Sequence, residues 1–385
     1  MEINKKSILK LFLIGKFFFI IIFFISSVIF LKVLTYDYYP DFSSYYYSPI
    51  KVFNGENPYL GGKDFFTPFV YPPPVLLFFF PFTLLPFLIA QKLFLIISIV
   101  CLLSSIGLLF KLFKLAPFSI LGLFLITLVL NFFPEKFTLG MGQINNVVLL
   151  MVTLFIYFYV KKREILSGSF LAVAIALKLF PGLLIIYLIF GKRWKTLLSV
   201  ILTTLVIVLI TFVFVNPRII SFFYITVLPS LIESWKVDYY NQSLSAFLIR
   251  GWSSLELASI LRPIIGTVLI LISFIIVWKF KKNDKPGLLS ISLLITSSII
   301  VNTFSWQHHF VWLIIPLFIT FYYIKNNHLG KQYYLFLGLS YLLMAVNMKT
   351  PSSFPTLLQS HVLYGALLLY ILDAYILIKN KEIVF

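Results

Sequence analysis

Long apolar runs separated by short basic clusters dominate this chain and restrict its fold more than any other feature. Apolar residues make up 61% of the 385 residues, whereas charged residues make up only 11%. Several runs exceed the roughly 18 residues that a helix needs to cross a bilayer. Backbone groups that face lipid must be hydrogen-bonded internally, and the runs lack the roughly ten-residue alternation of membrane barrels. We therefore predict an all-α, polytopic integral membrane protein with a single membrane domain, residues 1–385.

The distribution of the basic residues predicts how the chain is oriented. The net charge is +18, and Lys and Arg form short clusters between the apolar runs rather than one continuous stripe. This is the positive-inside pattern, in which basic residues mark the cytoplasmic ends of spans, and nucleic acid is not expected as a partner. We predict a multi-pass protein of the plasma (inner) membrane with cytoplasmic N- and C-termini. The single cysteine, Cys101, lies within a span, so no disulfide is expected.

The basic clusters and the prolines divide the chain into about ten full spans, and short interfacial and re-entrant helices bring the total to about 10–13 membrane helices. Full spans are predicted at about 8–34, 87–110, 116–132, 143–160, 196–214, 260–279, 286–303, 309–324, 332–347 and 361–379. The first of these is too long for a signal peptide and is predicted to be a retained anchor. The proline-rich residues 74–86 are predicted to form a short interfacial helix. Outer loops are predicted at 35–73, 131–143 and 216–259.

Residues 165–190 lie between two basic clusters but are too few for two full spans. Near their centre, Lys178 is followed by Pro181, which breaks a helix. Non-helical backbone at membrane depth is tolerated only where it lines a cavity of the protein, and a charged residue there usually has a function. We predict a re-entrant pair of half-helices with Lys178 at the tip. The alternative is that Lys178 snorkels to the interface or pairs with a buried acid.

The predicted first extracytoplasmic loop, 35–73, is unusually long and unusually acidic. It contains four of the thirteen acidic residues of the chain, namely Asp37, Asp41, Glu56 and Asp64. A loop of this length between spans is usually functional. A carboxylate held beside apolar helices has a tunable basicity, which suits a general base, and Asp41 is our candidate. The alternative is that Asp41 is an ordinary solvated acid. The second long loop, 216–259, adds Glu233 and Asp238 on the same predicted side.

Four further polar clusters fall on the same predicted side as Asp41. They are Gly142-Gln143-Ile144-Asn145-Asn146, Lys178-Leu-Phe-Pro181, Asn241-Gln242-Ser243 with Arg250, and Ser305-Trp306-Gln307-His308-His309. Cationic side chains of this set suit a phosphate, whereas the amides and the tryptophan suit sugar hydroxyls. Simpler interpretations remain, since the asparagines commonly begin a helix and Arg250 suits a membrane interface. The adjacent histidines are a residue type that often binds metals. Because neighbouring residues point to different helix faces, however, we predict no metal site.

The order of these motifs resembles glycosyltransferase family 87, the polyprenyl-phosphate-mannose-dependent mannosyltransferases of the GT-C superfamily. The resemblance begins in the first loop with Asp41-Phe-x-x-Tyr45, Asn54-Gly-Glu-Asn57-Pro58-Tyr59 and Tyr71-Pro72-Pro73. It continues with Gly142-Gln143-x-Asn145, Ala176-Leu-Lys178-x-x-Pro181, Asn241-Gln242-Ser243-Leu244 with Arg250, and Ser305-Trp306-x-His308-His309. No single motif is specific, but together they cover residues 41–312 in the family's order.

The resemblance implies a GT-C-like helix bundle that takes a sugar, mannose in this family, from a polyprenyl-phosphate donor at the extracytoplasmic face. The acceptor would be a glycolipid or glycan, and the reaction would be an inverting single displacement with Asp41 as general base. Candidates for binding the donor phosphate are Lys178, Arg250, His308 and His309. Candidates for binding the sugar or the acceptor are Tyr45, Asn57, Tyr59, Gln143, Asn145, Asn241, Gln242 and Trp306. The family is regarded as metal-independent, so neither a metal nor a cofactor is expected.

A transporter or flippase of a lipid-linked or charged substrate is the alternative function. A broken helix with a central lysine suits a transport site. Transport, however, predicts a binding site near the midplane of the bilayer, whereas the polar clusters gather at one predicted surface. This asymmetry favours the enzyme. A polysaccharide polymerase or ligase would share the substrates but usually carries a large soluble outer loop, which the sequence lacks.

Overall fold

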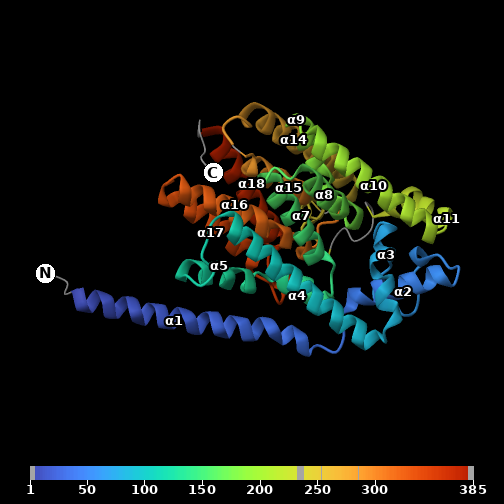
Figure 1. Ribbon diagram of the computed structural model, residues 1–385, viewed down its shortest axis with the longest axis horizontal. Coiled ribbons are helices and arrows are strands. Elements are labelled where there is room, and N and C mark those ends of the chain that lie inside the picture. Colours follow the sequence, from blue (N-terminus) through green and yellow to red (C-terminus); the bar gives the residue numbers. More distant parts are fainter. Residues whose placement is uncertain (1–4, 232–237, 253, 285, 380–385) are drawn as a thin grey trace.

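The computed structural model describes residues 5–231, 238–252, 254–284 and 286–379. Within these ranges every regular element is a helix, and the one β-type pairing is an isolated bridge between Asn241 and Trp306. The prediction of an all-α fold is therefore confirmed. Both termini lie toward the left of Figure 1, whereas α2, α3 and α11 lie at the right-hand end.

The helices alternate between long elements and short, broken ones. The α-helices are α1 (Lys5–Leu31), α2 (Pro40–Phe53), α3 (Pro74–Phe79), α4 (Phe87–Leu112), α5 (Ile120–Asn131), α6 (Phe133–Met141), α7 (Asn145–Val160), α8 (Glu164–Leu177), α9 (Leu184–Phe190), α10 (Trp194–Phe214), α11 (Pro217–Phe222), α12 (Leu228–Ser230), α13 (Leu244–Trp252), α14 (Leu255–Phe280), α15 (Leu288–Val301), α16 (Ile314–Asn326), α17 (Lys331–Ala345) and α18 (His361–Lys379). The short 3-10 or π-helical segments are η1 (Lys32–Thr35), η2 (Pro58–Leu60), η3 (Phe80–Leu84), η4 (Phe180–Leu183), η5 (Phe223–Val227), η6 (Gln307–Leu313), η7 (Pro351–Ser353) and η8 (Leu358–Ser360).

Within the described residues, six helices are long and apolar enough to cross a membrane. They are Gly15–Thr35, Phe87–Leu112, Trp194–Phe214, Leu255–Phe280, Gln307–Asn326 and Leu358–Lys379. The pair α5 and α6 passes the same test together, although it is bent by 53°, and makes a seventh. Two predicted full spans correspond to the shorter apolar helices α7 and α15. The multi-pass character is thus supported, and the count of about ten full spans stays a prediction.

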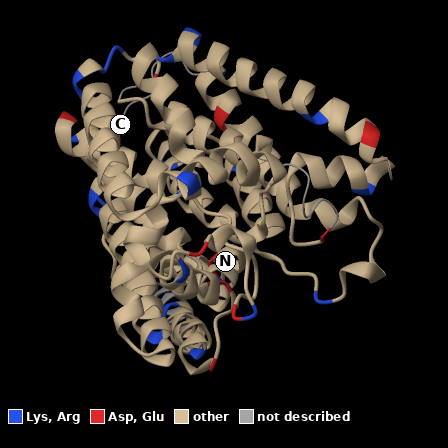
Figure 2. Ribbon diagram, turned by 90° about the vertical axis from the view of Figure 1, so that its right-hand side faces the viewer, with Lys and Arg blue, Asp and Glu red and all other residues tan. Residues whose placement is uncertain are grey.

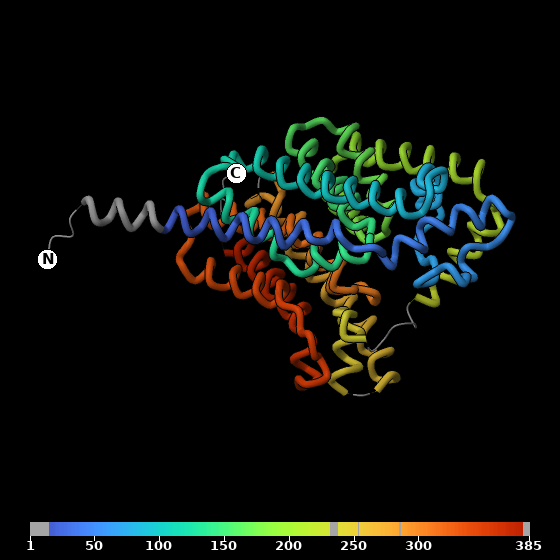
Figure 3. The backbone as a smooth tube through the Cα atoms, turned by 90° about the horizontal axis from the view of Figure 1, so that it is seen from below, coloured from blue at the N-terminus to red at the C-terminus, as the bar shows by residue number. Residues whose placement is uncertain are grey.

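The long helices differ in how much of their surface the protein covers. Only 22% of the apolar window of α14 is buried inside the protein, compared with 83% for the segment formed by η6 and α16. Helices α1, α10 and α14 therefore present apolar side chains outward, as a bilayer requires, and α1 runs along the side of the bundle (Figures 1 and 3). Charged residues are sparse on the ribbon (Figure 2). The interior is built on α7, α15 and α16.

Two breaks in the helical order shape the site. The residues predicted as the outer loop 131–143 are largely the helix α6, which corrects that expectation. Helix α5 stops at Asn131 because Pro134 has no N–H to continue it, and the chain turns into α6. The second break separates α8 from α9 at Lys178, where the sequence predicted a broken hairpin.

Candidate active site

Asp41 lies buried at the beginning of α2, within the residues predicted to form the first outer loop. Pro40 begins the helix and places Asp41 in its first turn, where backbone N–H groups favour a carboxylate. Gln143 Nε2 donates a hydrogen bond to Asp41 Oδ2, and Thr67 Oγ1 donates to Oδ1 at 3.3 Å. Burial raises the pKa of Asp41 to about 6, although the Gln143 hydrogen bond and the positive charge of Lys178 oppose this rise. Asp41 is therefore a carboxylate of raised basicity that is still ionised at neutral pH.

The position of Gln143 depends on the glycine that precedes it. Gly142 ends α6 in the left-handed region, at φ +70°, which costs energy in any residue with a side chain. A Cβ atom at this position would lie 2.8 Å from Tyr39 Cβ and 3.0 Å from Phe42 Cβ, on and beside the first turn of α2. Only glycine therefore allows α6 to end so close to α2, and this contact brings Gln143 to Asp41.

Two tyrosines fix the orientation of the Gln143 amide. Its Oε1 accepts hydrogen bonds from the hydroxyl of Tyr45 at 2.9 Å and from that of Tyr71 at 3.1 Å. Because the amide oxygen is occupied in this way, the amide nitrogen faces the carboxylate of Asp41. The arrangement supplies a donor that steadies the ionised form of Asp41.

Lys178 lies at the break between α8 and α9, and its side chain is only 5% exposed. Its Nζ donates a hydrogen bond of 2.7 Å to Asn145 Oδ1 and lies 5.3 Å from the centre of the Tyr71 ring and 5.7 Å from that of Trp312. Among the described residues no carboxylate lies within 4.0 Å of it, since the one ion pair found there joins Lys51 and Glu56. A buried cation that is held by neutral partners is suited to bind an anion.

Asn145 connects Lys178 to η6, the helical segment that contains His308 and His309. Its Nδ2 donates a 3.0 Å hydrogen bond to the backbone carbonyl of His308, which also accepts from Thr138 Oγ1 at 3.0 Å. The backbone carbonyl of Asn145 accepts from Trp312 Nε1 at 3.0 Å. The beginning of α7 is therefore bound to η6 at several points, and the Lys178 ammonium is held in a fixed place.

Asp41 and Lys178 line two adjoining cavities. The acid cavity, of about 460 Å³, is lined by residues that include Asp41, Thr67, Gln143, Asp238, Trp306 and His308. The lysine cavity, of about 380 Å³, is lined by residues that include Lys178, Phe180, Leu183, Asn302 and His309. Val70, Tyr71 and Phe304 line both cavities, so they form a shared wall. The acid cavity is lined by two carboxylates and no Lys or Arg, whereas the lysine cavity is lined by one cation and no carboxylate.

The two adjacent histidines lie on different sides of this wall. His308 lines the acid cavity, and its Nδ1 is buried without a hydrogen-bond partner among the described residues. His309 lines the lysine cavity, and its Nδ1 accepts a hydrogen bond from the backbone N–H of Trp306 at 3.2 Å. The sequence predicted that His308 or His309 would bind the phosphate and did not distinguish between them; His309 is the one that lines the cavity of Lys178.

Arg250, the remaining candidate for the phosphate, lines neither cavity. Its guanidinium donates hydrogen bonds to the backbone carbonyls of Asp238 and Asn241, at 3.2 and 3.0 Å, and to Ser360 Oγ at 2.9 Å. These contacts attach the segment before α13 to the end of η8. The segments around 240–260 and 345–360 project together from the bundle, as Figure 3 shows.

Asn241 and Gln242 belong to the same segment before α13 that Arg250 attaches to η8. The backbone N–H of Gln242 donates to the carbonyl of Ser305 at 2.8 Å, and that of Gln307 donates to the carbonyl of Tyr240 at 2.8 Å. Gln242 Nε2 donates to the carbonyl of Gln359 at 2.8 Å. Neither Asn241 nor Gln242 lines either cavity, whereas Trp306, to which this segment is joined, lines the acid cavity. Glu233, also noted in this loop, lies outside the described residues.

Three candidates from the first loop lie behind the cavity wall. Tyr45 packs its ring on Phe79, with centres 4.3 Å apart, and reaches the site through Gln143. Asn57 caps η2 by accepting a 3.0 Å hydrogen bond from the backbone N–H of Tyr59. The Tyr59 hydroxyl donates to the carbonyl of Tyr71 at 2.9 Å. These residues support Tyr71 and do not line either cavity.

No functional role was predicted for several residues that line the cavities. Thr67 and Tyr71 stand in the same loop as Asp41, and Asp238 stands in the polar stretch before Asn241. Their polar or aromatic character was visible, but nothing local showed which of them would face inward. Nothing in the sequence indicated that Phe304 would line a cavity, because it is one of 44 phenylalanines in the chain.

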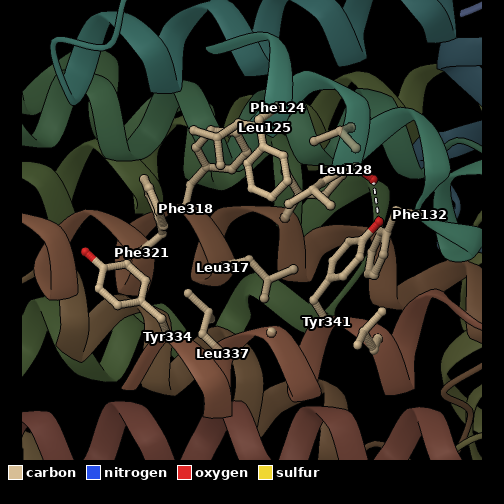
Figure 4. A pocket seen from close by; sticks show the side chains of 14 residues that line it. Phe124, Leu125, Leu128, Phe132, Leu317, Phe318, Phe321, Tyr334, Leu337 and Tyr341 are labelled. Atoms are coloured by element: carbon tan, nitrogen blue, oxygen red, sulfur yellow. Dashed lines mark hydrogen bonds between the residues drawn. The ribbon is translucent and has the colours of Figure 1, made fainter. Parts of the chain in front are cut away.

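A separate pocket of about 420 Å³ lies between α5, α16 and α17 and is almost wholly apolar (Figure 4). Its one visible hydrogen bond runs from the Tyr341 hydroxyl to the backbone carbonyl of Leu128, at 2.8 Å. It offers no group for acid–base or phosphate chemistry. Elsewhere in the described ranges, no cluster of three or more His, Cys, Asp or Glu side chains is arranged to hold a metal ion.

Comparison with known proteins gives three similarities. The family model of glycosyltransferase family 87 matches residues 69–303, more than half of the chain. The polyprenol-phosphate-mannose-dependent alpha-(1-2)-phosphatidylinositol pentamannoside mannosyltransferase of Mycobacterium tuberculosis (strain CDC 1551 / Oshkosh) is 26% identical over 271 residues, which are 66% of this chain and 58% of that relative. The match thus spans less than two thirds of the relative's length. The crystal structure of ArnT from Cupriavidus metallidurans bound to undecaprenyl phosphate superimposes on 97% of this chain and 77% of its own, with a TM-score of 0.40 and 13% identity.

Proposed function

Because the chain belongs to glycosyltransferase family 87, and is thus a membrane glycosyltransferase, we propose that it transfers a hexose from a polyprenyl-phosphate donor to a hydroxyl of a glycolipid or glycan. The relative from Mycobacterium tuberculosis is named for a polyprenol-phosphate-mannose donor and a phosphatidylinositol glycolipid acceptor, which supports mannose as the hexose. The observation that carries the proposal is the pair of adjoining cavities of opposite charge.

The acid cavity is the acceptor site in this proposal. Its carboxylates repel a donor phosphate and accept hydrogen bonds from sugar hydroxyls, and Trp306 provides an aromatic surface for a sugar ring. Asp41 accepts the proton of the attacking hydroxyl as the oxygen forms a bond to the anomeric carbon. Gln143 and Thr67 orient the carboxylate through their hydrogen bonds. His308 offers its unpartnered Nδ1 to a further acceptor hydroxyl.

The lysine cavity holds the leaving group. As the bond between the anomeric carbon and the phosphate oxygen breaks, the electron pair stays on that oxygen, and the phosphate gains negative charge. The Lys178 ammonium, held by Asn145, stabilises this charge from a position that requires no rearrangement during the reaction. His309 lines the same cavity and adds a polar ring beside the phosphate.

The shared wall sets the direction of attack. The acceptor oxygen approaches from the acid cavity while the phosphate departs into the lysine cavity, so entry and departure take opposite faces of the anomeric carbon. A single displacement with inversion is therefore the stereochemical outcome that we propose. Tyr71 contributes to both sides, since its hydroxyl binds Gln143 and its ring faces the Lys178 ammonium.

We place the reaction at the extracytoplasmic face of the plasma membrane, with both termini in the cytoplasm. The positive-inside distribution supports this, because basic clusters adjoin the helix ends that lie opposite α2 and η6. We also propose that the chain forms a single membrane domain with a GT-C-like arrangement.

The experiment that tests the function uses purified protein in liposomes. Polyprenyl phosphates carrying radiolabelled mannose, glucose, galactose or arabinose are supplied with total lipid extract as acceptor, and the labelled product is identified. We expect transfer of one hexose and inversion at its anomeric carbon. Movement of the intact donor across the bilayer without cleavage would contradict the proposal and support the transporter alternative.

A further inference from the structure

A third cavity opens beside the lysine cavity and contains a single cation. It has a volume of about 590 Å³ and is lined by residues of α12 and α14 and by the turn that follows α15. Four residues, Leu228, Val301, Asn302 and Phe304, line both this cavity and the lysine cavity. We call it the lateral groove. The two spaces therefore adjoin one another, and Phe304 borders all three cavities of the site region.

The cation in the lateral groove is Arg262, on the second turn of α14. Its side chain is partly buried, and within the described residues the guanidinium makes no hydrogen bond or ion pair. Its neighbours in the groove are mainly apolar, including Leu228, Pro229 and Ile270. A guanidinium gains nothing in stability from such a setting without an anion, and a charge in a membrane helix usually serves a function.

The groove faces the bilayer. Helix α14 buries little of its surface in the protein, and Pro263 and Thr267, which line the groove beside Arg262, are exposed. A ligand that enters here therefore combines an anionic group with a hydrocarbon chain. Guanidinium groups bind phosphate oxygens through two parallel hydrogen bonds, and the apolar lining suits an isoprenoid chain.

We propose that the lateral groove binds the phosphate of the polyprenyl-phosphate lipid through Arg262, outside the catalytic cavities, as the lipid passes between the bilayer and Lys178. The inference rests on the proposed function, because it takes the same lipid as its ligand. Arg262 acts here as a docking residue that sets the affinity for the lipid, and it does not contact the reacting bond. Phe304 and Leu228, which line both spaces, border the path between the two cations.

The first test separates binding from chemistry. Arg262→Gln should raise the KM for the donor about tenfold, as expected for a lost charge-assisted hydrogen bond, while kcat stays within about twofold of wild type. The KM of Arg262→Lys should lie between those of the wild type and Arg262→Gln, since lysine keeps the positive charge but lacks the planar guanidinium that binds two phosphate oxygens at once. Arg218→Gln is the matched control, because Arg218 is an exposed arginine of α11 that does not line the groove. A fall in kcat with an unchanged KM, or an equal effect of Arg218→Gln, would overturn the proposal.

The second test identifies the ligand without relying on transfer. A photoreactive polyprenyl monophosphate that carries no sugar is added to the protein in vesicles of neutral phosphatidylcholine, and the labelled peptides are mapped. We expect labelling of α14 and of residues 228–231, reduced by Arg262→Gln and retained in Arg218→Gln. If the KM effect appears only in vesicles that contain phosphatidylglycerol, and the probe leaves α14 unlabelled, the groove binds an ordinary anionic phospholipid and the proposal fails. A wild-type protein that binds the probe at α14 but transfers no sugar would refute the proposed function alone.

Discussion

The acid cavity and the lysine cavity share a wall but are built in different ways. Around Asp41, side-chain hydrogen bonds from Gln143 and Thr67 link α2 to the end of α6 and to the loop before α3. Lys178 is instead held at a helix break, by one amide and two aromatic rings. The two charges influence each other but form no ion pair. A direct ion pair between Asp41 and Lys178 would leave neither side chain free to bind substrate. The shared wall separates the two, so that a base and an anion-binding site remain available close together.

Loss of the base should have the largest effect. Asp41→Asn keeps the shape of the side chain and removes its ability to accept a proton, so we expect transfer to fall about 10²- to 10⁴-fold. The donor should still bind, because its phosphate lies in the other cavity. The measurements are kcat for transfer and the affinity for polyprenyl monophosphate. Near-normal kcat in Asp41→Asn would eliminate Asp41 as the base.

The same variant should not destabilise the protein. Burial raises the pKa of Asp41 from 3.8 to about 6, so the folded state binds more protons than the unfolded state between these two values. The contribution of Asp41 to stability is therefore greatest at low pH and falls as the pH rises through this window. At neutral pH, Asp41→Asn should leave the melting temperature equal or higher. A clear fall in the melting temperature would show that Asp41 has a structural role.

Loss of the cation should have the next largest effect and should act on the other substrate. Lys178→Gln removes the positive charge that faces the leaving phosphate, and we expect kcat to fall about 10²- to 10³-fold, with weaker binding of the donor. The KM for the acceptor should change little. Lys63→Gln, which removes an exposed lysine of the first loop, is the matched control. Equal weakening of donor and acceptor binding by Lys178→Gln would mean that the two cavities do not divide the substrates.

The pH profile should show that the two cavities are coupled. With Asp41 as base, kcat/KM should fall about tenfold per unit as the pH drops below about 6. The charge of Lys178 lowers the pKa of Asp41, so Lys178→Gln should shift the inflection upward in its remaining activity. Lys63→Gln should leave the inflection in place. An inflection that does not move would show that the wall screens the two charges from each other.

The sequence predicted the chemistry of the site better than its geometry. Lys178 was identifiable because a charge within apolar sequence is costly and therefore informative, and Asp41 because it stands in a long, acidic loop between spans. The division of His308 and His309 between two cavities follows from their adjacency, but their assignment to particular cavities depends on η6. Arg250 and Tyr59 were predicted to bind substrate from their place in the motifs, yet they bind backbone carbonyls behind the cavity walls. The sequence shows which side chains could take part in the chemistry, whereas only the packing of the folded chain decides which of them face the substrate.

The helix pattern was predicted to a similar degree. Hydropathy identified the long helices, and the proline after Lys178 marked the break between α8 and α9. Residues 131–143 were predicted as an outer loop because they lie between two predicted spans, yet most of them form α6, which packs against η6. Tertiary contacts of this kind override the local signal of a short segment.

The smallest effect should come from the backbone that supports each cavity, and a pair of glycines makes the comparison. Gly142→Ala forces a side chain into the left-handed region and against Tyr39, so we expect a loss of about 1–3 kcal/mol in stability. The shift of Gln143 should reduce transfer several-fold. Gly182 lies in η4, which follows Lys178 in the chain. It has no positive φ and nothing within 4 Å of an added Cβ, so Gly182→Ala should change neither the stability nor the transfer rate. Thermal melting in detergent and initial transfer rates measure the two effects. If both variants behave alike, the acid cavity does not depend on the close approach of α6 to α2, and the difference in construction between the two cavities loses its physical basis.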